Sequence, residues 1–252
     1  MPFPPTVLLP LTLPGLLQYV LTTQTGTAST TLVICSSRET FLRDLVQSLQ
    51  DAQNGEKDGS LQDLATPTLH NLSTTRHVKL AFCASVQALL AYLTAYGRGG
   101  NAQMVERGQK ARLILVNPIA LHAPTPSFSA QGLSRTFAAA AEMALESGVS
   151  LQVVECQGSR RSVKQQGDED VDLANRDGEE HGATWEAEAE LEDTEKDPWE
   201  QEVSILNVSA RRFTSNGGER AWAGRTVKAK RVAARWFYFQ QLDTAQTREG
   251  QG

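Results

Sequence analysis

The chain has 252 residues, of which 40% are hydrophobic and 21% charged, with 24 Lys and Arg against 29 Asp and Glu. These fractions are typical of a soluble globular protein and exclude a fully disordered, collagen-like or coiled-coil chain. The three cysteines, Cys35, Cys83 and Cys156, are far apart in the sequence. Their spacing excludes a disulfide scaffold and a cysteine-rich zinc module, and it fits a reducing compartment.

The net charge of −5 hides a strong asymmetry along the chain. Residues 168–202 hold 16 acidic and 2 basic residues, whereas residues 211–235 hold 8 basic residues and one acid. The acidic stretch has too few apolar residues to offset its ordering entropy, so residues 158–202 are predicted to be a disordered loop insertion. Trp185 and Trp199 are expected to dock locally. The insertion is interpreted either as a solvated loop without a function or as an electrostatic mimic that competes with nucleic acid for a basic surface.

Residues 1–29 form an apolar, proline-rich N-terminal segment. Its prolines each remove a backbone donor, and no basic residue precedes the apolar run, so neither a membrane helix nor a signal peptide is predicted. Two alternatives remain for this segment. It docks on a partner, or it packs on the protein's own sheet.

From residue 30 onward, apolar β-rich runs alternate with helical patterns. Ser37 and Ser85 are predicted to cap helices, and Gly148 to end one. This alternation predicts a parallel α/β sheet. Later strands, joined by the Gly217-Gly218 turn signal, are predicted to be antiparallel additions at the sheet edge. The predicted strands are 31–35, 77–83, 113–117, 149–156, 203–208 and one or two within 227–239; a helix is predicted at 133–146, loop at 51–76 and a flexible tail at 241–252.

The sequence lacks the motifs of nucleotide, metal or nucleophile chemistry. It contains no G-x-x-x-x-G-K-[ST], no G-x-G-x-x-G after a strand, no G-x-S-x-G, no C-x-x-C and no H-x-x-x-H. Cys35 and Cys83 are expected to pack as small hydrophobic residues. Structural or surface roles are expected for the four histidines, His70, His77, His122 and His181. No catalytic residue, metal ligand or cofactor is predicted.

The order of these elements resembles that of RecA-like recombinases of the eukaryotic type. TLVICSSRETFLRDL (31–45) is similar to the strand and helix after the phosphate-binding helix, and ARLILVNPIALH (111–122) to the Walker B strand. HVKLAFC (77–83) matches the unit between them, residues 127–157 the loop, helix and strand that follow, and residues 219–239 the C-terminal hairpin. The resemblance implies a single RecA-like α/β domain, with a mostly parallel sheet flanked by helices and a C-terminal antiparallel hairpin.

The chain departs from this family at two parts of the ATP site. The Walker A loop belongs before residue 30, where the chain reads LLPLTLPGLLQYVLTTQTGTAST, without the glycines and the lysine that hold phosphates. Asn117 replaces the Walker B acid and is a weak Mg²⁺ ligand. The expectation is therefore a P-loop fold without Walker motifs that neither hydrolyses nor binds ATP.

RecA-like chains that lost ATP chemistry in this way resemble two groups. The DNA-binding subunits of the Shu complex imply a non-catalytic subunit of a nuclear complex in homologous recombination repair. Its partners would be RecA-like paralogue subunits in a hetero-oligomer and DNA bound without sequence specificity. The RecA-like subunits of Elongator imply instead a role in wobble-uridine modification of transfer RNA, with a cytoplasmic location. A small α/β enzyme with an unrecognised site is the third alternative. No membrane partner is expected.

The resemblance also indicates where nucleic acid binds. In the recombinases a mobile loop after the corresponding strand faces DNA, and here that loop is Gln157–Gln166, with Arg160, Arg161 and Lys164. A solvated loop with incidental charge is the alternative. The second family loop, Ala123–Ser129, carries no Arg or Lys.

A second basic cluster lies near the C-terminus, and Lys228, Lys230 and Arg231 are its predicted nucleic-acid contacts. Taken as a strand, it places Lys228 and Lys230 on one face and Arg231 and Arg235 on the other. The alternative is an edge strand that charge protects against aggregation. Trp222 and Trp236 beside these charges are predicted either to stack on bases or to anchor a core or interface.

Overall fold

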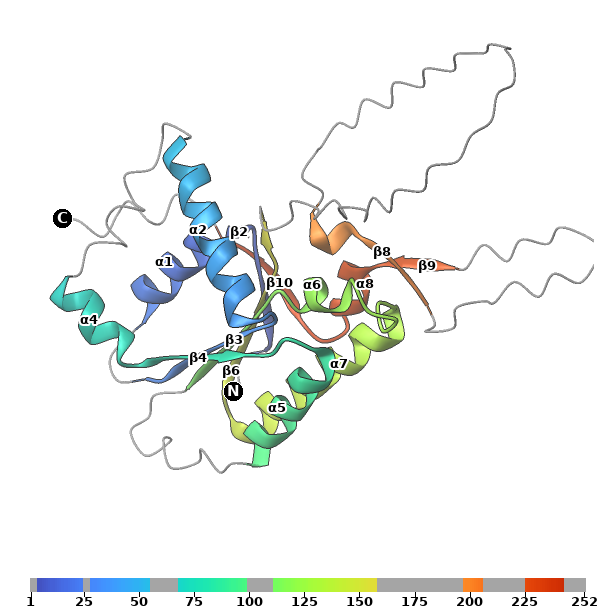
Figure 1. Ribbon diagram of the computed structural model, residues 1–252. Helices are drawn as coiled ribbons and strands as arrows, with labels where there is room; N and C mark the ends of the chain where they lie inside the picture. The colour runs from blue at the N-terminus through green and yellow to red at the C-terminus, as the bar shows by residue number, and fades with distance from the viewer. Residues whose placement is uncertain are drawn as a thin grey trace, which may run out of the picture.

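The computed structural model describes residues 4–24, 28–54, 68–98, 111–157, 197–205 and 225–242. Its centre is a six-stranded sheet of order β10-β1-β6-β5-β3-β4, in which every pairing is parallel (Figure 1). The strands are β1 (Thr6–Leu9), β3 (Thr30–Ile34), β4 (Val78–Phe82), β5 (Arg112–Val116), β6 (Ser150–Val154) and β10 (Tyr238–Gln241).

Two small strand pairs lie beside the sheet. The first, β2 (Leu11–Thr12) with β7 (Cys156–Gln157), is parallel, and the second, β8 (Glu202–Ser204) with β9 (Thr226–Lys228), is antiparallel. The architecture confirms the predicted α/β fold class, with a mostly parallel sheet, flanking helices and a C-terminal antiparallel strand pair.

Helices cover both faces of the sheet. On one face α1 (Leu13–Thr23) and α2 (Arg38–Asn54) pack over Ile114 and Val116; on the other, α5 (Val86–Arg98) and α7 (Ala130–Ser147) pack over Leu113 and Leu115. Alternate residues of one strand thus enter two separate cores, because successive side chains of a strand point to opposite faces. The shorter helices are α4 (Leu69–Thr75), α6 (Pro118–His122), η2 (Pro198–Glu200) and α8 (Ala229–Ala233).

The predicted helix boundaries have the expected caps. The Ser37 hydroxyl accepts a hydrogen bond from Thr40 N (3.1 Å), and the Ser85 hydroxyl accepts one from Ala88 N (3.1 Å). Gly148 ends α7 in the left-handed region, with φ 65°. These caps satisfy backbone groups that a helix end leaves unpaired, so the sequence signals are confirmed.

The N-terminal segment packs on the protein's own sheet, which is the second of the two predicted alternatives. Strand β1 lies between β6 and β10, and Val7 and Leu8 are fully buried. Pro14 lies in the first turn of α1, where a missing N–H costs no helical hydrogen bond. Residues 6–23 therefore belong to the protein's own core.

Two predictions about local structure are wrong. Residues 69–75 form α4 inside the stretch predicted to be loop. The one or two strands predicted within 227–239 are present as β9 and β10, but the strand alternation assumed across residues 228–235 is wrong, since alanine, lysine and arginine favour helix at Ala229–Ala233. β10 then pairs in parallel with β1 and is not an antiparallel addition.

The disorder predicted for the acidic insertion does not extend to its C-terminal end. Residues 197–202, which the sequence assigned to the disordered insertion, form η2 and the start of β8. Trp199 is fully buried there, as its expected local docking requires. The rest of the predicted insertion, residues 158–196, lies outside the described residues, as does the tail beyond residue 242.

In the part of the chain that the structure describes, no helix has the length and apolar character needed to cross a membrane.

The close approach of α7 to the loop before it gives a test of the fold. A Cβ at Gly132 would overlap with the carbonyl oxygen of Ser127, which is backbone and cannot rotate away. Gly132→Ala is therefore expected to lower the free energy of unfolding by about 1–3 kcal/mol, as overpacking does. Urea denaturation measures this.

Gly97→Ala in α5 is the matched control. Its new Cβ would come closest to the flexible end of Glu146 at 3.2 Å and would meet Met143 at ordinary contact distances of 3.7 and 4.0 Å, so the better helix propensity of alanine should dominate. Equal destabilisation by both substitutions would contradict the close approach at Gly132.

Candidate nucleic-acid interface

The connection between β1 and α1 lies where the resemblance places the phosphate-binding loop. It is short: β1 ends at Leu9 and α1 begins at Leu13, with β2 between them pairing Leu11 with Cys156. At the start of α1, Gly15 N donates to the Thr12 hydroxyl at 3.2 Å, and Pro14 has no N–H. The first turn thus offers few of the backbone donors that cradle a phosphate.

Asn117, the residue that the resemblance aligns with the Walker B acid, makes structural contacts. It adopts the left-handed conformation (φ 60°), and its Oδ1 accepts a hydrogen bond from Cys156 N at 2.7 Å. The buried Glu155 carboxylate accepts a hydrogen bond from Ile119 N at the start of α6. Both side chains hold the ends of β5 and β6 together. Glu155 was not selected from the sequence, although a single charge directly after the apolar end of a strand is the signal that marks it.

The buried thiols at this edge of the sheet are poor nucleophiles. Burial first, and then the nearby Glu155 carboxylate, raise the pKa of Cys35 and of Cys156. Burial also raises the pKa of Cys83. The thiols are therefore protonated at neutral pH and pack as small hydrophobic residues, as predicted for Cys35 and Cys83. Among the described residues, no group of three His, Cys, Asp or Glu is placed to hold a metal ion.

His122 anchors the loop that follows β5 and α6. It is fully buried, with Nε2 2.9 Å from the Thr136 hydroxyl and Nδ1 3.2 Å from the Ser127 carbonyl oxygen. Since a carbonyl only accepts, Nδ1 carries the proton and Nε2 accepts from Thr136. The imidazole ties residues 123–129 to α7, which is the structural role expected for it.

A cationic surface is formed by α8 and the chain on either side of it. Residues 225–242 contain five basic residues and no acid, and all five basic side chains are exposed. The Trp236 indole N–H donates to the Ser134 hydroxyl at 3.4 Å, which brings the end of this segment to α7 next to the exposed Arg135. The cationic surface comprises Arg135, Arg225, Lys228, Lys230, Arg231 and Arg235.

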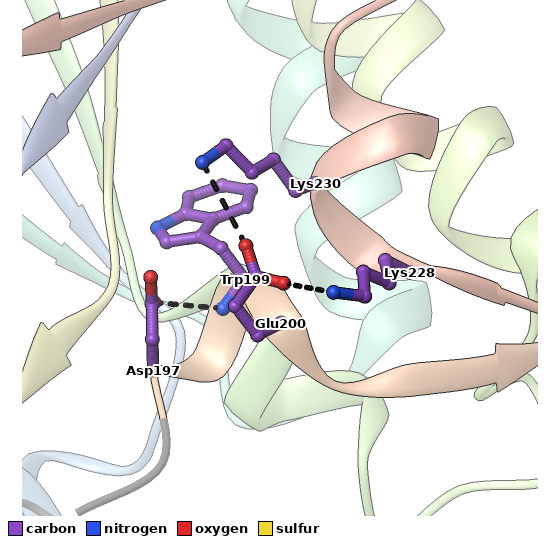
Figure 2. A network of polar contacts seen from close by, with 5 residues as sticks. All are labelled: Asp197, Trp199, Glu200, Lys228 and Lys230. Atoms are coloured by element: carbon purple, nitrogen blue, oxygen red, sulfur yellow. Dashed lines mark hydrogen bonds and ion pairs between the residues drawn. The ribbon is translucent and has the colours of Figure 1, made fainter.

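Glu200 occupies part of the cationic surface. Figure 2 shows its carboxylate between two lysines, with Oε2 2.6 Å from Lys228 Nζ and Oε1 3.7 Å from Lys230 Nζ. The hydrogen bond to Lys228 lowers the pKa of Glu200, and the same bond raises the pKa of Lys228. Glu200 and Lys228 are therefore both charged at neutral pH, and the negative charge of Glu200 offsets part of the positive charge of the two lysines.

The acid is held in place by the helix to which it belongs. Trp199 packs edge-on against Phe239 of β10, with ring centroids 5.3 Å apart, and Lys230 Nζ lies 5.6 Å from the centroid of Phe239. Asp197 caps the turn, because its Oδ1 accepts a hydrogen bond from Trp199 N at 3.0 Å. Burial of Trp199 thus fixes the backbone from which Glu200 extends.

The predicted contact residues are only partly placed by the structure. Arg160, Arg161 and Lys164 lie outside the described residues. Lys228, Lys230 and Arg231 are each exposed, but the two-residue periodicity assigned to them is wrong, since Lys230 and Arg231 lie on α8. Among the described ion pairs, the lysines contact Glu200 and no pair involves Arg231.

Arg135 of the cationic surface and the acid that pairs with its lysines, Glu200, were not selected from the sequence. Arg135 is isolated in an alanine-rich helix and gives no local signal. Glu200 was counted only as part of an acidic run. Trp236, predicted either to stack on bases or to anchor a core or interface, is partly exposed, and Trp222 lies outside the described residues.

A cavity of about 400 Å³ lies between the start of β3, β4 and α5. It is lined by Thr31, Lys79, Leu80, Tyr92 and Tyr96, together with alanine and serine side chains. Burial, with smaller contributions from Tyr96 and Cys83, raises the pKa of Tyr92. The described lining residues include no carboxylate or imidazole that would act as a general base.

No family model matches the chain, and no curated protein matches it. Among solved structures it is similar to a DnaB-like replicative helicase, described with its interactions with primase, at 13% identity and a TM-score of 0.37. The match covers 68% of this chain and 42% of the helicase chain. At that TM-score the likeness adds no argument to the topology described above.

The buried His122 gives a testable pH dependence. Burial lowers its pKa below the ordinary 6.5, so the unfolded chain takes up a proton at higher pH than the folded protein does. The free energy of unfolding is therefore at its full value above pH 6.5 and falls as the pH drops from there to the folded-state pKa. Urea denaturation on both sides of pH 6.5 should show this slope in the wild type and a reduced slope in His122→Gln.

Thr136→Val serves as the control, because it removes one hydrogen bond and keeps the imidazole. It is expected to lower stability by about 1–3 kcal/mol while retaining the pH slope. An unchanged slope in His122→Gln would show that another group causes it.

Proposed function

We propose that this chain is a non-catalytic, RecA-like subunit of a nuclear complex that binds DNA and assists homologous recombination repair. The observation that supports this is the cationic surface, in which residues 225–242 present five exposed cations and no acid. Such a density of positive charge on one short segment is typical of a phosphate-binding surface.

The chemistry of the cationic surface suits a phosphate backbone. Arginine remains charged at every accessible pH and offers paired N–H donors that match two phosphate oxygens. Arg231 and Arg235 are exposed on and just after α8, and no described ion pair involves either of them. No element of the described fold presents a base-reading helix or ribbon of a known type, so binding is proposed to be independent of sequence.

A role without catalysis is supported by the carboxyl edge of the sheet. The β1–α1 connection is occupied by the β2–β7 pair, and Asn117 bonds Cys156 through the oxygen that would contact a metal ion. These contacts favour a scaffold over an ATPase. The alternative of a small α/β enzyme would need an acid or imidazole cluster in a folded pocket.

A place in a hetero-oligomer with RecA-like paralogue subunits is supported by the outer edge of the sheet. Within the described residues β4 pairs with β3 alone, and Leu80 on β4 is 51% exposed. An unpaired strand edge with an exposed apolar side chain is a common contact surface for another chain.

Transfer RNA presents the same phosphate groups as DNA. An Elongator-type role is therefore distinguished from a role in DNA repair by the proteins with which the chain associates. Affinity purification of the tagged protein from its own cells, followed by mass spectrometry, is the test. Recovery of recombinase or its paralogues supports the repair complex. Recovery of Elongator subunits overturns it and moves the chain to transfer RNA modification.

The DNA contact is tested directly with the double variant Arg231→Ala/Arg235→Ala. If each arginine makes a charge-assisted phosphate contact, removal of both should weaken DNA binding by about tenfold or more per contact. The slope of log affinity against log salt should become shallower by about 2. Fluorescence anisotropy with labelled DNA over a salt series measures both.

Arg38→Ala/Arg43→Ala is the matched control, since it removes two exposed arginines from α2, on the other face of the sheet. It should change affinity and salt slope far less. Equal losses in the two double variants would indicate that only net charge matters and would contradict a binding surface at α8.

A further inference from the structure

The two lysines and Glu200 form an arrangement that a general cationic surface does not require. Lys228 Nζ and Lys230 Nζ approach the two oxygens of one carboxylate from two sides, at 2.6 and 3.7 Å (Figure 2). Lys230 is also placed by the ring of Phe239. The two lysine ammonium groups thus converge on one carboxylate, that of Glu200.

A carboxylate and a phosphodiester present the same contact geometry to such a pair. Each spreads a negative charge over two terminal oxygens that accept hydrogen bonds from ammonium groups. The position of the Glu200 carboxylate therefore marks where a backbone phosphate would be bound by both lysines at once.

Glu200 is held at this position by its neighbours. Trp199 is buried, Asp197 caps the turn, and Gln201 O accepts a hydrogen bond from Ala229 N at 2.8 Å, which joins η2 to the start of α8. The backbone before and after Glu200 is consequently fixed. The local fold therefore holds the Glu200 carboxylate next to the two lysines.

We propose that Lys228 and Lys230 form a phosphate-binding pair, and that the Glu200 carboxylate occupies this pair in the free protein as an internal competitor that nucleic acid displaces. The proposal rests on the proposed function, because it assigns one phosphate position and its regulation within the cationic surface. The displaced Glu200 turns into solvent; its ion pairs with the two lysines are exchanged for ion pairs with phosphate, and no covalent bond is made or broken.

The exposure of the contact makes displacement feasible. The side chains of Lys228, Lys230 and Glu200 are 59%, 46% and 42% exposed. Ion pairs at this exposure are screened by water and salt and contribute little to stability. A polyanion that binds elsewhere on the cationic surface can then replace Glu200. Glu200 thereby lowers the affinity of the lysines for phosphate but does not block their access to it.

The test compares Glu200→Gln with Glu202→Gln in the full chain. Both substitutions remove one negative charge, and the residues are two positions apart. Glu202 accepts a hydrogen bond from the Thr226 hydroxyl at 2.8 Å and makes no ion pair with a lysine among the described ion pairs, and its charge raises the pKa of Lys228 less than that of Glu200 does. Binding to a fluorescein-labelled mixed-sequence oligonucleotide is measured by anisotropy over a salt series, with DNA and RNA arms.

Glu200→Gln is expected to tighten binding by about 2- to 10-fold over wild type, and to steepen the salt slope by about one unit as the freed lysines engage phosphate. Glu202→Gln should differ little from wild type. The gain should vanish in a Lys228→Ala/Lys230→Ala background, which closes a double-mutant cycle on the pair. Thermal melts and Glu200→Ala guard against a folding defect in one variant.

The outcomes separate the two proposals. If the wild type binds but Glu200→Gln and Glu202→Gln behave alike, the phosphate pair is overturned and the proposed function stands. If Glu200→Gln tightens binding equally in the lysine-free background, the competitor acts by general charge and the pair is again overturned. If neither wild type nor Glu200→Gln binds DNA or RNA at low salt, the proposed function fails and this inference fails with it.

Discussion

Strand β1 contributes only four residues, yet it pairs on both sides, with β6 and with β10. Val7 and Leu8 point to opposite faces of the sheet and are fully buried in the two cores. Without β1, the C-terminal strand β10 would have no partner in the sheet, because β1 is the strand that it pairs with. The pairing of the first and last described strands therefore decides where the C-terminal segment, with its cations, meets the rest of the molecule.

The position of α8 follows from that pairing. Phe237 packs edge-on against Phe137 of α7, and Phe239 packs against Trp199, so alternate aromatic side chains bind β10 to two other elements. Val232 and Ala233 of α8 are buried, while Lys230, Arg231 and Arg235 are exposed. A short helix with one buried side must place its charged residues outward, and the fixed position of β10 puts them beside α7. The surface charge is thus a consequence of core packing.

The sequence predicted the central strands and the capped helices because both depend on local patterns. The runs at 31–35 and 113–117 are apolar in four of five positions, as strands buried on both faces are expected to be. The two ends of the chain were harder. The prolines around Thr6–Leu9 hid a strand whose stability comes from partners more than 140 residues away. At residues 228–235, alternating charge suggested a strand, whereas the alanines and tertiary packing produced a helix. The pairing of Glu200 with Lys228 joins segments whose proximity no local pattern encodes.

An acid within a surface proposed to bind nucleic acid is physically reasonable. Five cations within 18 residues repel one another, and such self-repulsion destabilises a compact arrangement. A carboxylate shared by Lys228 and Lys230 relieves part of that repulsion in the free protein. The same carboxylate opposes a polyanion, so its effect on binding has the opposite sign to its effect on folding. Because the pair is exposed, both effects are small, and a ligand with several phosphates outweighs the single internal one. If nucleic acid binds as proposed, the arrangement that permits the fold to carry a dense positive charge also discriminates against short or singly charged anions, for which displacement of Glu200 brings no further contacts.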